Sequence, residues 1–200
     1  KSVFQTRNGA VCHIPEVDVA KKDKNHFVYN ASATKGLLPL VNDIWPTIKK
    51  HIPEAHLTII GGYYRFLEGA APDEQEKTVR ELASSEDLAK LGVTFTGVIP
   101  QKQIAEILAN AYMMLYPSMF PETFGISTLE SMLYRTPLVT CNFGALEETA
   151  IDLANYKIDY SVEPQFTCPA VIKEEQTQKF LQLFFDAYNN TYLHQQKQYY

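Results

Sequence analysis

The sequence is poor in cysteine, in basic residues and in long apolar runs, and each shortage argues against a class of protein. Its three cysteines, Cys12, Cys141 and Cys168, lie far apart without a Cys-x-x-Cys pair, so reduced thiols in a cytoplasmic protein are favoured over a disulfide framework or a zinc site. Lys and Arg total 18 against 23 Asp and Glu, a net charge of −5, so we expect no nucleic-acid partner. No apolar run reaches the roughly 18 residues that a membrane helix needs.

The interrupted basic run Lys21–Lys24 is best interpreted as a solvated linker. No His or Asp residues show metal-ligand spacing, so no metal site is expected. The length of 200 residues suits one well-packed domain, and 46% hydrophobic with 20% charged residues is ordinary globular usage. Because the chain starts without Met or a signal peptide, we expect it to begin inside a longer polypeptide.

Short apolar runs alternate with amphipathic runs along the chain, which is the pattern of strands alternating with helices. Strands are expected over 26–30, 56–60, 93–96, 112–116 and 137–140. Helices are expected over 37–48, kinked or shortened by Pro46, over 73–91, 104–111, 124–134 and 145–153, and around 181–192. The alternation predicts an α/β fold, a Rossmann-like parallel sheet with helices on both faces. Ligands of such sheets bind at the carboxyl ends of the strands.

The stretch from Tyr116 to Glu130 runs from a strand through a loop into a helix and is the most informative part of the chain. Gly125 opens that helix, where the absence of a Cβ lets a ligand approach the backbone. The unpaired N–H groups and positive dipole end of the first turn suit an anion such as a diphosphate. Glu122 precedes this turn, and Glu130 leans back toward it and could accept from two ribose hydroxyls. On physical grounds alone, Glu122 and Glu130 are about equally well interpreted as ligand-binding residues and as solvated surface glutamates.

The same stretch contains a Glu-x7-Glu element, Glu122 to Glu130, with Pro-Ser before it and Thr-Pro-Leu-Val after it. Further short matches follow in order along the chain: Asn8-Gly9, Lys35-Gly36, the runs 53–61 and 93–98, and the loop 144–147. Together they resemble the C-terminal, nucleotide-sugar-binding half of retaining glycosyltransferases of the GT-B fold, in family 4. The resemblance implies one half of a GT-B fold, in which residues 1–25 are the interdomain linker and domain start and residues 26–200 the nucleotide-sugar-binding domain with its C-terminal helix.

The resemblance also implies a role for each matching residue. As the two catalytic residues, Glu122 would hold the donor sugar near its reacting carbon and Lys35 would stabilise the departing diphosphate. Glu130 would bind the ribose hydroxyls. The other donor-binding residues would be Phe124, Gly125 and Ile126 at the helix start, Val98 and Ile99 at the base, and Gly61, Gly62 and Arg65 after the second strand. No metal or other cofactor is implied.

The chain departs from the family pattern at a few positions. Asn30 stands where the family usually has an Arg, five residues before the Lys, so one cation for the diphosphate is missing unless Arg65 replaces it. Phe143 stands where the family has a Gly, and the usual Gly-rich loop after Glu148 is absent. Donor affinity or donor identity is therefore expected to differ from the family pattern.

The expected function is that of the donor-binding domain of a retaining glycosyltransferase, of the hexosyltransferase type, which moves a sugar from a UDP- or GDP-sugar to an acceptor hydroxyl. The expected partners are the missing N-terminal GT-B domain and an acceptor that is a glycan, a lipid or a protein, with peripheral membrane association of the full-length protein. Without that N-terminal domain the chain is expected to be inactive. Two alternatives stay open: a nucleotide-sugar-binding module without catalysis, and a GT-B-shaped UDP-sugar epimerase.

Overall fold

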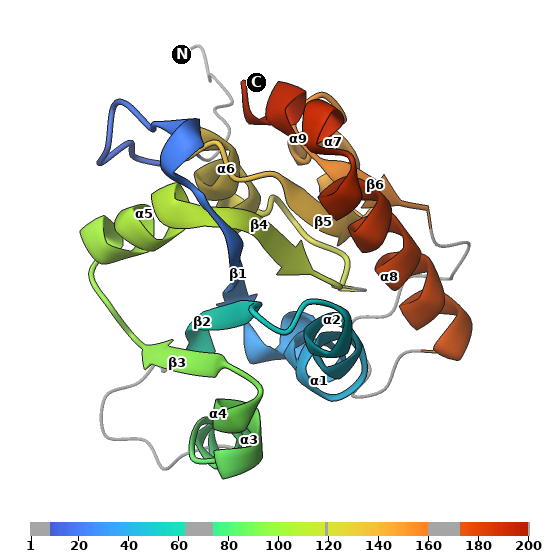
Figure 1. The fold of residues 1–200 in the computed structure, drawn as a ribbon. Coiled ribbons are helices and arrows are strands. Elements are labelled where there is room, and N and C mark those ends of the chain that lie inside the picture. The colour runs from blue at the N-terminus through green and yellow to red at the C-terminus, as the bar shows by residue number, and fades with distance from the viewer. Residues whose placement is uncertain (1–8, 63–73, 119, 160–172, 200) are drawn as a thin grey trace, which may run out of the picture.

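The computed structural model describes residues 9–62, 74–118, 120–159 and 173–199, which are built around one parallel sheet (Figure 1). Within these residues the sheet has six strands in the order β3-β2-β1-β4-β5-β6, and every adjacent pair is parallel. The strands are β1 (Asp23–Ser32), β2 (His56–Gly62), β3 (Val93–Gly97), β4 (Ala111–Tyr116), β5 (Leu138–Cys141) and β6 (Tyr156–Ile158). The strand order changes direction between β1 and β4, which is where open α/β sheets bind ligands.

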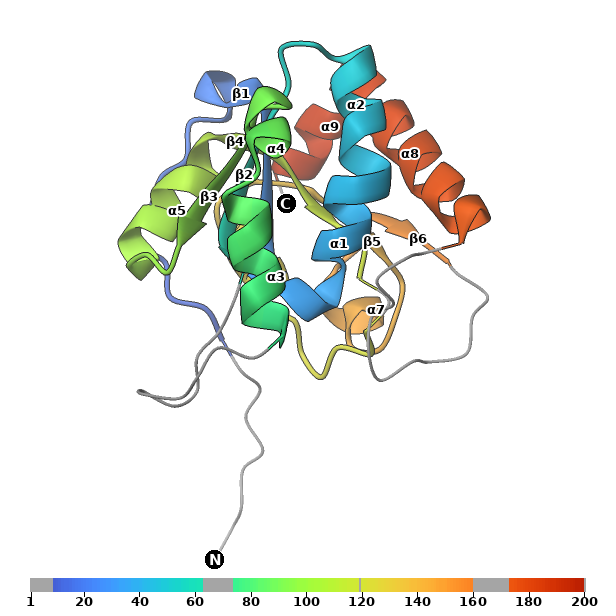
Figure 2. The same ribbon diagram turned by 90° about the horizontal axis from the view of Figure 1, so that it is seen from below.

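Helices cover both faces of the sheet (Figures 1 and 2). On one face, α1 (Leu37–Pro39), the π-helical η3 (Leu40–Ile44) and α2 (Trp45–His51) pack together, and α8 (Glu174–Asn189) packs on η3. On the other face, α5 (Gln101–Asn110) packs against α6 (Ile126–Leu133). The other helices are η1 (Val19–Lys21), η2 (Ala33–Lys35), α3 (Glu74–Ala83), α4 (Glu86–Lys90), α7 (Leu146–Thr149) and α9 (Thr191–Gln198). The predicted Rossmann-like α/β fold is confirmed.

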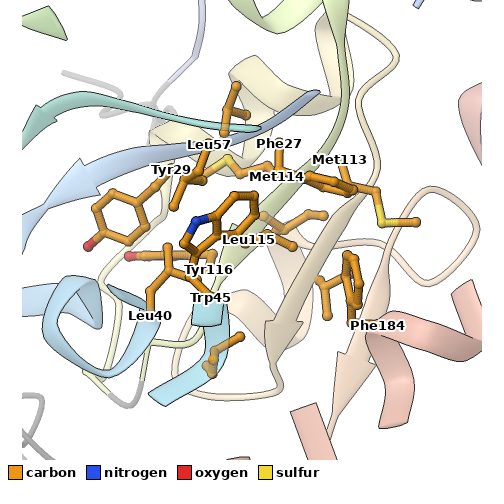
Figure 3. Packing of buried hydrophobic residues seen from close by; sticks show 14 of the residues in the cluster. Phe27, Tyr29, Leu40, Trp45, Leu57, Met113, Met114, Leu115, Tyr116 and Phe184 are labelled. Carbon is orange, nitrogen blue, oxygen red and sulfur yellow. The ribbon is translucent and has the colours of Figure 1, made fainter. Parts of the chain in front are cut away.

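The two central strands form the core because helices cover them on both sides. All six residues of β4 are buried, and Phe27, Val28 and Tyr29 of β1 are fully buried. Such continuous apolar runs are typical of buried parallel strands. Trp45 of α2 and Phe184 of α8 pack on Phe27, with ring centroids 6.0 and 5.3 Å from it (Figure 3). This packing fixes β1 and β4, whose carboxyl ends lie side by side.

Several helices differ from the predicted ones because local chemistry interrupts them. Pro46 has no N–H and its ring crowds the preceding turn, so the helix widens into η3 just before it and then continues as α2. The helix predicted over 73–91 is divided at Ser85, whose hydroxyl accepts a backbone N–H of α4. The last helix is divided at Asn190, whose side chain caps α9 in the same way.

The edge of the sheet beyond β5 also differs from the prediction. The helix expected over 145–153 ends at Thr149, and the chain then forms β6, which pairs with β5. A strand of three residues is too short to show a pattern in the sequence, so β6 is not predicted. None of the described helices combines the length and apolar character that crossing a bilayer requires.

The interpretation of Lys21–Lys24 as a solvated linker is wrong, because Asp23 and Lys24 are the first residues of β1 and Lys22 is hydrogen-bonded to neighbouring elements. The Lys22 ammonium donates to the carbonyl oxygens of Leu108, Ala109 and Ala111 at 3.1, 3.0 and 2.9 Å and to Thr136 Oγ1 at 2.8 Å. Leu108 and Ala109 lie in the last turn of α5, where carbonyl oxygens lack helical partners, and Ala111 is the first residue of β4. Burial lowers the pKa of Lys22 to about 7. The lysine therefore ties the start of β1 to the corner between α5 and β4.

Candidate functional site

A pocket of about 220 Å³ opens at the carboxyl ends of β1 and β4. Three segments line it: the turn after β1, the end of β4, and the loop that leads into α6. The lining residues are Ala31, Ser32, Lys35, Tyr116, Glu122, Thr123, Phe124, Gly125, Ile126 and Ser127. The pocket therefore brings together both predicted catalytic residues and the three donor-binding residues predicted at the start of the helix.

Lys35 and Glu122 form an ion pair in this pocket, with Lys35 Nζ 2.7 Å from Glu122 Oε1. The side chain of Lys35 is 27% exposed, and that of Glu122 is 5% exposed. The Tyr116 hydroxyl donates to the same carboxylate oxygen. Burial raises the pKa of Tyr116 well above its usual value, so this hydroxyl keeps its proton and stays a donor. Among the described residues, both donors to Glu122 converge on Oε1, which leaves Oε2 for another partner.

Two glycines with positive φ hold the loop that presents Glu122. Gly36, at φ 105°, directly follows η2, and a Cβ there would lie 2.6 Å from the carbonyl oxygen of Pro117. Gly144 has φ 59°, and a Cβ there would lie 2.8 Å from both the backbone N and the backbone O of Glu122. Glu122 O also accepts from Ala145 N at 2.8 Å. Turns after β1 and β5 thus hold the β4–α6 loop through close backbone contacts that a side chain would block.

The N-terminal end of α6 faces the pocket. Gly125, at φ 81°, precedes its first residue, and no side chain within the described ranges caps the helix. A Cβ on Gly125 would lie 3.1 Å from the Leu146 side chain, so the glycine also allows close packing there. Ile126 and Ser127, whose backbone N–H groups belong to the first turn, line the pocket together with Lys35. An uncapped helix start next to a lysine attracts anions, and a phosphate group suits both.

Glu130 lies further along α6 and is not among the residues that line the pocket. Its Oε2 accepts a hydrogen bond from Asn30 Nδ2 at 3.1 Å. Burial raises the pKa of Glu130, whereas hydrogen bonds from the Asn30 and Gln101 side chains and the charge of His13 oppose that rise. Asn30 directly precedes the lining residue Ala31, so Glu130 borders the pocket rather than forming its wall.

The other predicted donor-binding residues that the structure describes are not among those that line this pocket. Val98, which is 78% exposed, and Ile99 follow β3, which is separated from β1 by β2. Gly61 lines a second pocket of about 350 Å³ between the ends of β2 and β3 and helix α3. Gly62 is the last residue of β2. Arg65 lies outside the described residues.

Sequence reasoning missed three of the side chains that bond to the two glutamates, which are Tyr116 on Glu122 and Asn30 and Gln101 on Glu130. Tyr116 belongs to the apolar run of β4 and so resembles a core residue, and Asn30 draws attention only as a replacement for an arginine. A hydrogen-bonding group at the carboxyl end of a buried strand is the signal that identifies both. The part of the chain that the structure describes contains no group of three His, Cys, Asp or Glu side chains able to hold a metal ion.

The sequence over residues 15–164 matches the model of the family described as Glycosyl transferases group 1. The chain belongs to this family. Among solved structures, it is similar to the C-terminal domain of a glycosyl transferase group 1 family protein, LpcC, from Francisella tularensis, with 17% identity and a TM-score of 0.60. The match covers 90% of this chain and 83% of that domain. The sheet and its helices therefore have the fold of one half of a GT-B glycosyltransferase, as predicted.

Two longer proteins share the fold. The pneumococcal O-GlcNAc transferase GtfA, solved with UDP and GlcNAc, has 18% identity and a TM-score of 0.60 over 92% of this chain and 34% of its own. Anabaena HepE, solved with UDP and glucose, has 16% identity and a TM-score of 0.60 over 90% of this chain and 42% of its own. The chain thus spans less than half the length of either protein. A search among curated proteins finds no match.

Proposed function

We propose that the chain is the donor-binding domain of a retaining glycosyltransferase, of the hexosyltransferase type in family 4, and that it binds a nucleoside diphosphate sugar. The Lys35–Glu122 pair in front of the uncapped start of α6 is the observation that supports this most directly. One cation, one buried carboxylate and free backbone N–H groups suit a diphosphate and a sugar hydroxyl that lie side by side. GtfA and HepE were solved with UDP and a sugar, which agrees with this class of ligand.

In this proposal the diphosphate lies between Lys35 and the first turn of α6. The Lys35 ammonium is paired with Glu122 in the free pocket, so the diphosphate competes with Glu122 for it. When the bond between the sugar carbon and the diphosphate oxygen breaks, its electron pair moves onto that oxygen. Lys35 and the helix dipole stabilise the new negative charge, so we propose no metal or other cofactor. Glu122, still held by Tyr116, accepts a hydrogen bond from the sugar.

The nucleoside half of the donor extends away from this turn. Glu130 accepts from the ribose hydroxyls, and the main chain at Val98 and Ile99 contacts the base. We propose that the backbone of Gly61 and Gly62 contacts the nucleotide from the side of β2. Arg65 is proposed only as a second cation for the diphosphate.

Transfer requires more than this domain in our proposal. The acceptor hydroxyl, on a glycan, a lipid or a protein, is brought by an N-terminal GT-B domain. Its oxygen replaces the diphosphate on the same face of the sugar, and its proton leaves with the diphosphate. The full-length protein is then a cytoplasmic enzyme with peripheral membrane association. The 200-residue chain binds the donor but does not transfer the sugar by itself. Interconversion of a UDP-sugar without any acceptor would instead indicate the epimerase.

Calorimetric titration of the chain with UDP and GDP tests the proposal. Lys35→Ala removes the cation of the diphosphate site, and Glu130→Ala removes the acceptor for the ribose. Each loses a hydrogen bond to a charged group, so we expect affinity for the preferred nucleotide to fall by about 10- to 100-fold.

Matched controls separate this effect from a general change in charge. Lys157→Ala removes a lysine of β6 that also forms an ion pair, with its Nζ 3.0 Å from Asp152 Oδ1. Glu106→Ala removes an exposed glutamate of the neighbouring helix α5. Both controls should bind UDP and GDP like the unaltered chain. Unchanged affinity in Lys35→Ala and Glu130→Ala would show that the pocket is not the nucleotide site.

A further inference from the structure

Asn30 is a buried polar side chain that follows the buried apolar run Phe27–Tyr29 of β1. It lies near the carboxyl end of β1, between β2 and β4, and is 8% exposed. Its neighbours Val28 and Tyr29 are fully buried in the core. A buried amide costs free energy unless it is hydrogen-bonded. Its partner is Glu130, whose Oε2 lies 3.1 Å from Asn30 Nδ2.

The donors that hold Glu130 are neutral. The side-chain amides of Asn30 and Gln101 both bond to its carboxylate, and none of the ion pairs between described residues includes it. The exposed His13, when protonated, also lowers the pKa of Glu130. An amide fixes one carboxylate oxygen without neutralising the charge, so the group remains a strong acceptor for further donors.

Resting on the proposed function, we propose that Asn30 is a positioning residue that orients the Glu130 carboxylate for the ribose hydroxyls of the nucleotide. Asn30 does not touch the nucleotide itself. A glutamate side chain has several rotatable bonds, and holding it before the ligand arrives lowers the entropy cost of binding. The hydrogen bond therefore favours ligands with an intact ribose and contributes nothing to the recognition of the phosphates.

Two ligands separate ribose recognition from phosphate recognition. UDP contains both groups, whereas inorganic pyrophosphate contains only the phosphates. Without Asn30 the Glu130 side chain regains rotamer freedom that binding must then remove, which predicts about two- to ten-fold weaker binding of UDP by Asn30→Ala. Asn30→Asp keeps the shape of the side chain but places a second carboxylate beside Glu130, so its loss should be at least as large. Pyrophosphate affinity should be unchanged in Asn30→Ala, the variant in which the two ligands are compared, because the added charge of Asn30→Asp repels any anion in the pocket.

A double-mutant cycle tests whether Asn30 acts through Glu130. The double variant Asn30→Ala/Glu130→Ala should bind UDP as weakly as Glu130→Ala alone, because the residue that Asn30 positions is absent. Additive losses would show that Asn30 acts on the ligand directly and would overturn the proposal. An equal loss of UDP and pyrophosphate affinity would overturn it as well, since a general disturbance of the pocket would affect both ligands.

Asn25→Ala is the matched control on the same strand. Asn25 Oδ1 accepts from the Tyr188 hydroxyl at 3.2 Å, near the other end of β1, so the control also loses one side-chain hydrogen bond. UDP affinity should be unchanged in it. If UDP binding depends on Lys35 and Glu130 but not on Asn30, the positioning role is wrong and the proposed function stands. If UDP and GDP do not bind the unaltered chain, the proposed function itself is wrong.

Discussion

His194 is a buried histidine whose protonation opposes folding. It lies in α9 and is 0% exposed. Its ring stacks on Tyr112 with centroids 3.9 Å apart, its Nε2 lies 3.2 Å from Tyr112 O, and its Nδ1 lies 3.4 Å from the Tyr156 hydroxyl. Burial, together with nearby lysines, lowers the pKa of His194 to about 3, although the hydrogen bond to Tyr112 O opposes this shift. The folded chain therefore keeps this ring neutral at mildly acidic pH.

The sign and size of the effect follow from proton linkage. An unfolded histidine has a pKa of about 6.5, so between that pH and about 3 the unfolded chain binds a proton that the folded chain does not. The contribution of His194 to the free energy of unfolding is complete above this range and is lost as the pH falls through it. At pH 5 the solution is about 1.5 units below the unfolded pKa, and about 1.36 kcal/mol per unit gives a loss of about 2 kcal/mol.

Urea unfolding at about pH 7.5 and pH 5 measures this loss. His194→Phe keeps an aromatic ring in place but cannot bind a proton, so its free energy of unfolding should fall by about 2 kcal/mol less than that of the unaltered chain. Hydrogen bonds lost in the variant are absent at both pH values and cancel in the difference. His51→Gln, which removes an exposed histidine of α2, is the matched control. Equal losses in the unaltered chain and His194→Phe would refute the argument.

Two further predictions concern the support of the pocket. Gly144→Ala forces a Cβ to 2.8 Å from the backbone of Glu122 at a positive φ, so the free energy of unfolding in urea should fall by roughly 1–3 kcal/mol and UDP should bind more weakly. Gly9→Ala, with no atom within 4 Å of the added Cβ, should change neither quantity. Equal effects of the two substitutions would contradict the idea that Gly144 holds the β4–α6 loop. Tyr116→Phe leaves Lys35 as the donor to Glu122, so a UDP-sugar should bind about ten-fold more weakly while UDP itself is unaffected. Equal losses for the two ligands in calorimetry would show that Glu122 does not contact the sugar.

The sheet could be predicted from the sequence because its central strands are continuous apolar runs between turn residues. The run Ala111–Tyr116 is such a strand. The helix predicted after Gly125 is also present in the structure. The breaks at Ser85 and Asn190 could not be predicted because each depends on one side chain capping a backbone N–H, and Ser and Asn also occur in continuous helices. Strand β6 depends on pairing with β5 and has no pattern of its own.

The site could be predicted in part. Lys35, Glu122 and Gly125 come from the turns after β1 and β4, and the fold class places neighbouring strand ends together, so their meeting in one pocket follows from the predicted sheet. The contacts of Tyr116 and Asn30 do not follow, because they depend on the register between β4, β1 and α6. That register is fixed by core packing around β1 and not by any local signal.

The close contacts of Gly36 and Gly144 with the β4–α6 loop have a consequence for how the chain folds. The loop is held by turns after β1 and β5, whose glycines Gly36 and Gly144 are far apart in sequence, so the pocket takes its shape only once these strands have joined the sheet. Such non-local contacts form late, because the chain must first close long loops. An anion that binds only the finished pocket would then stabilise the whole sheet, by about 2.7 kcal/mol at a hundred times its dissociation constant.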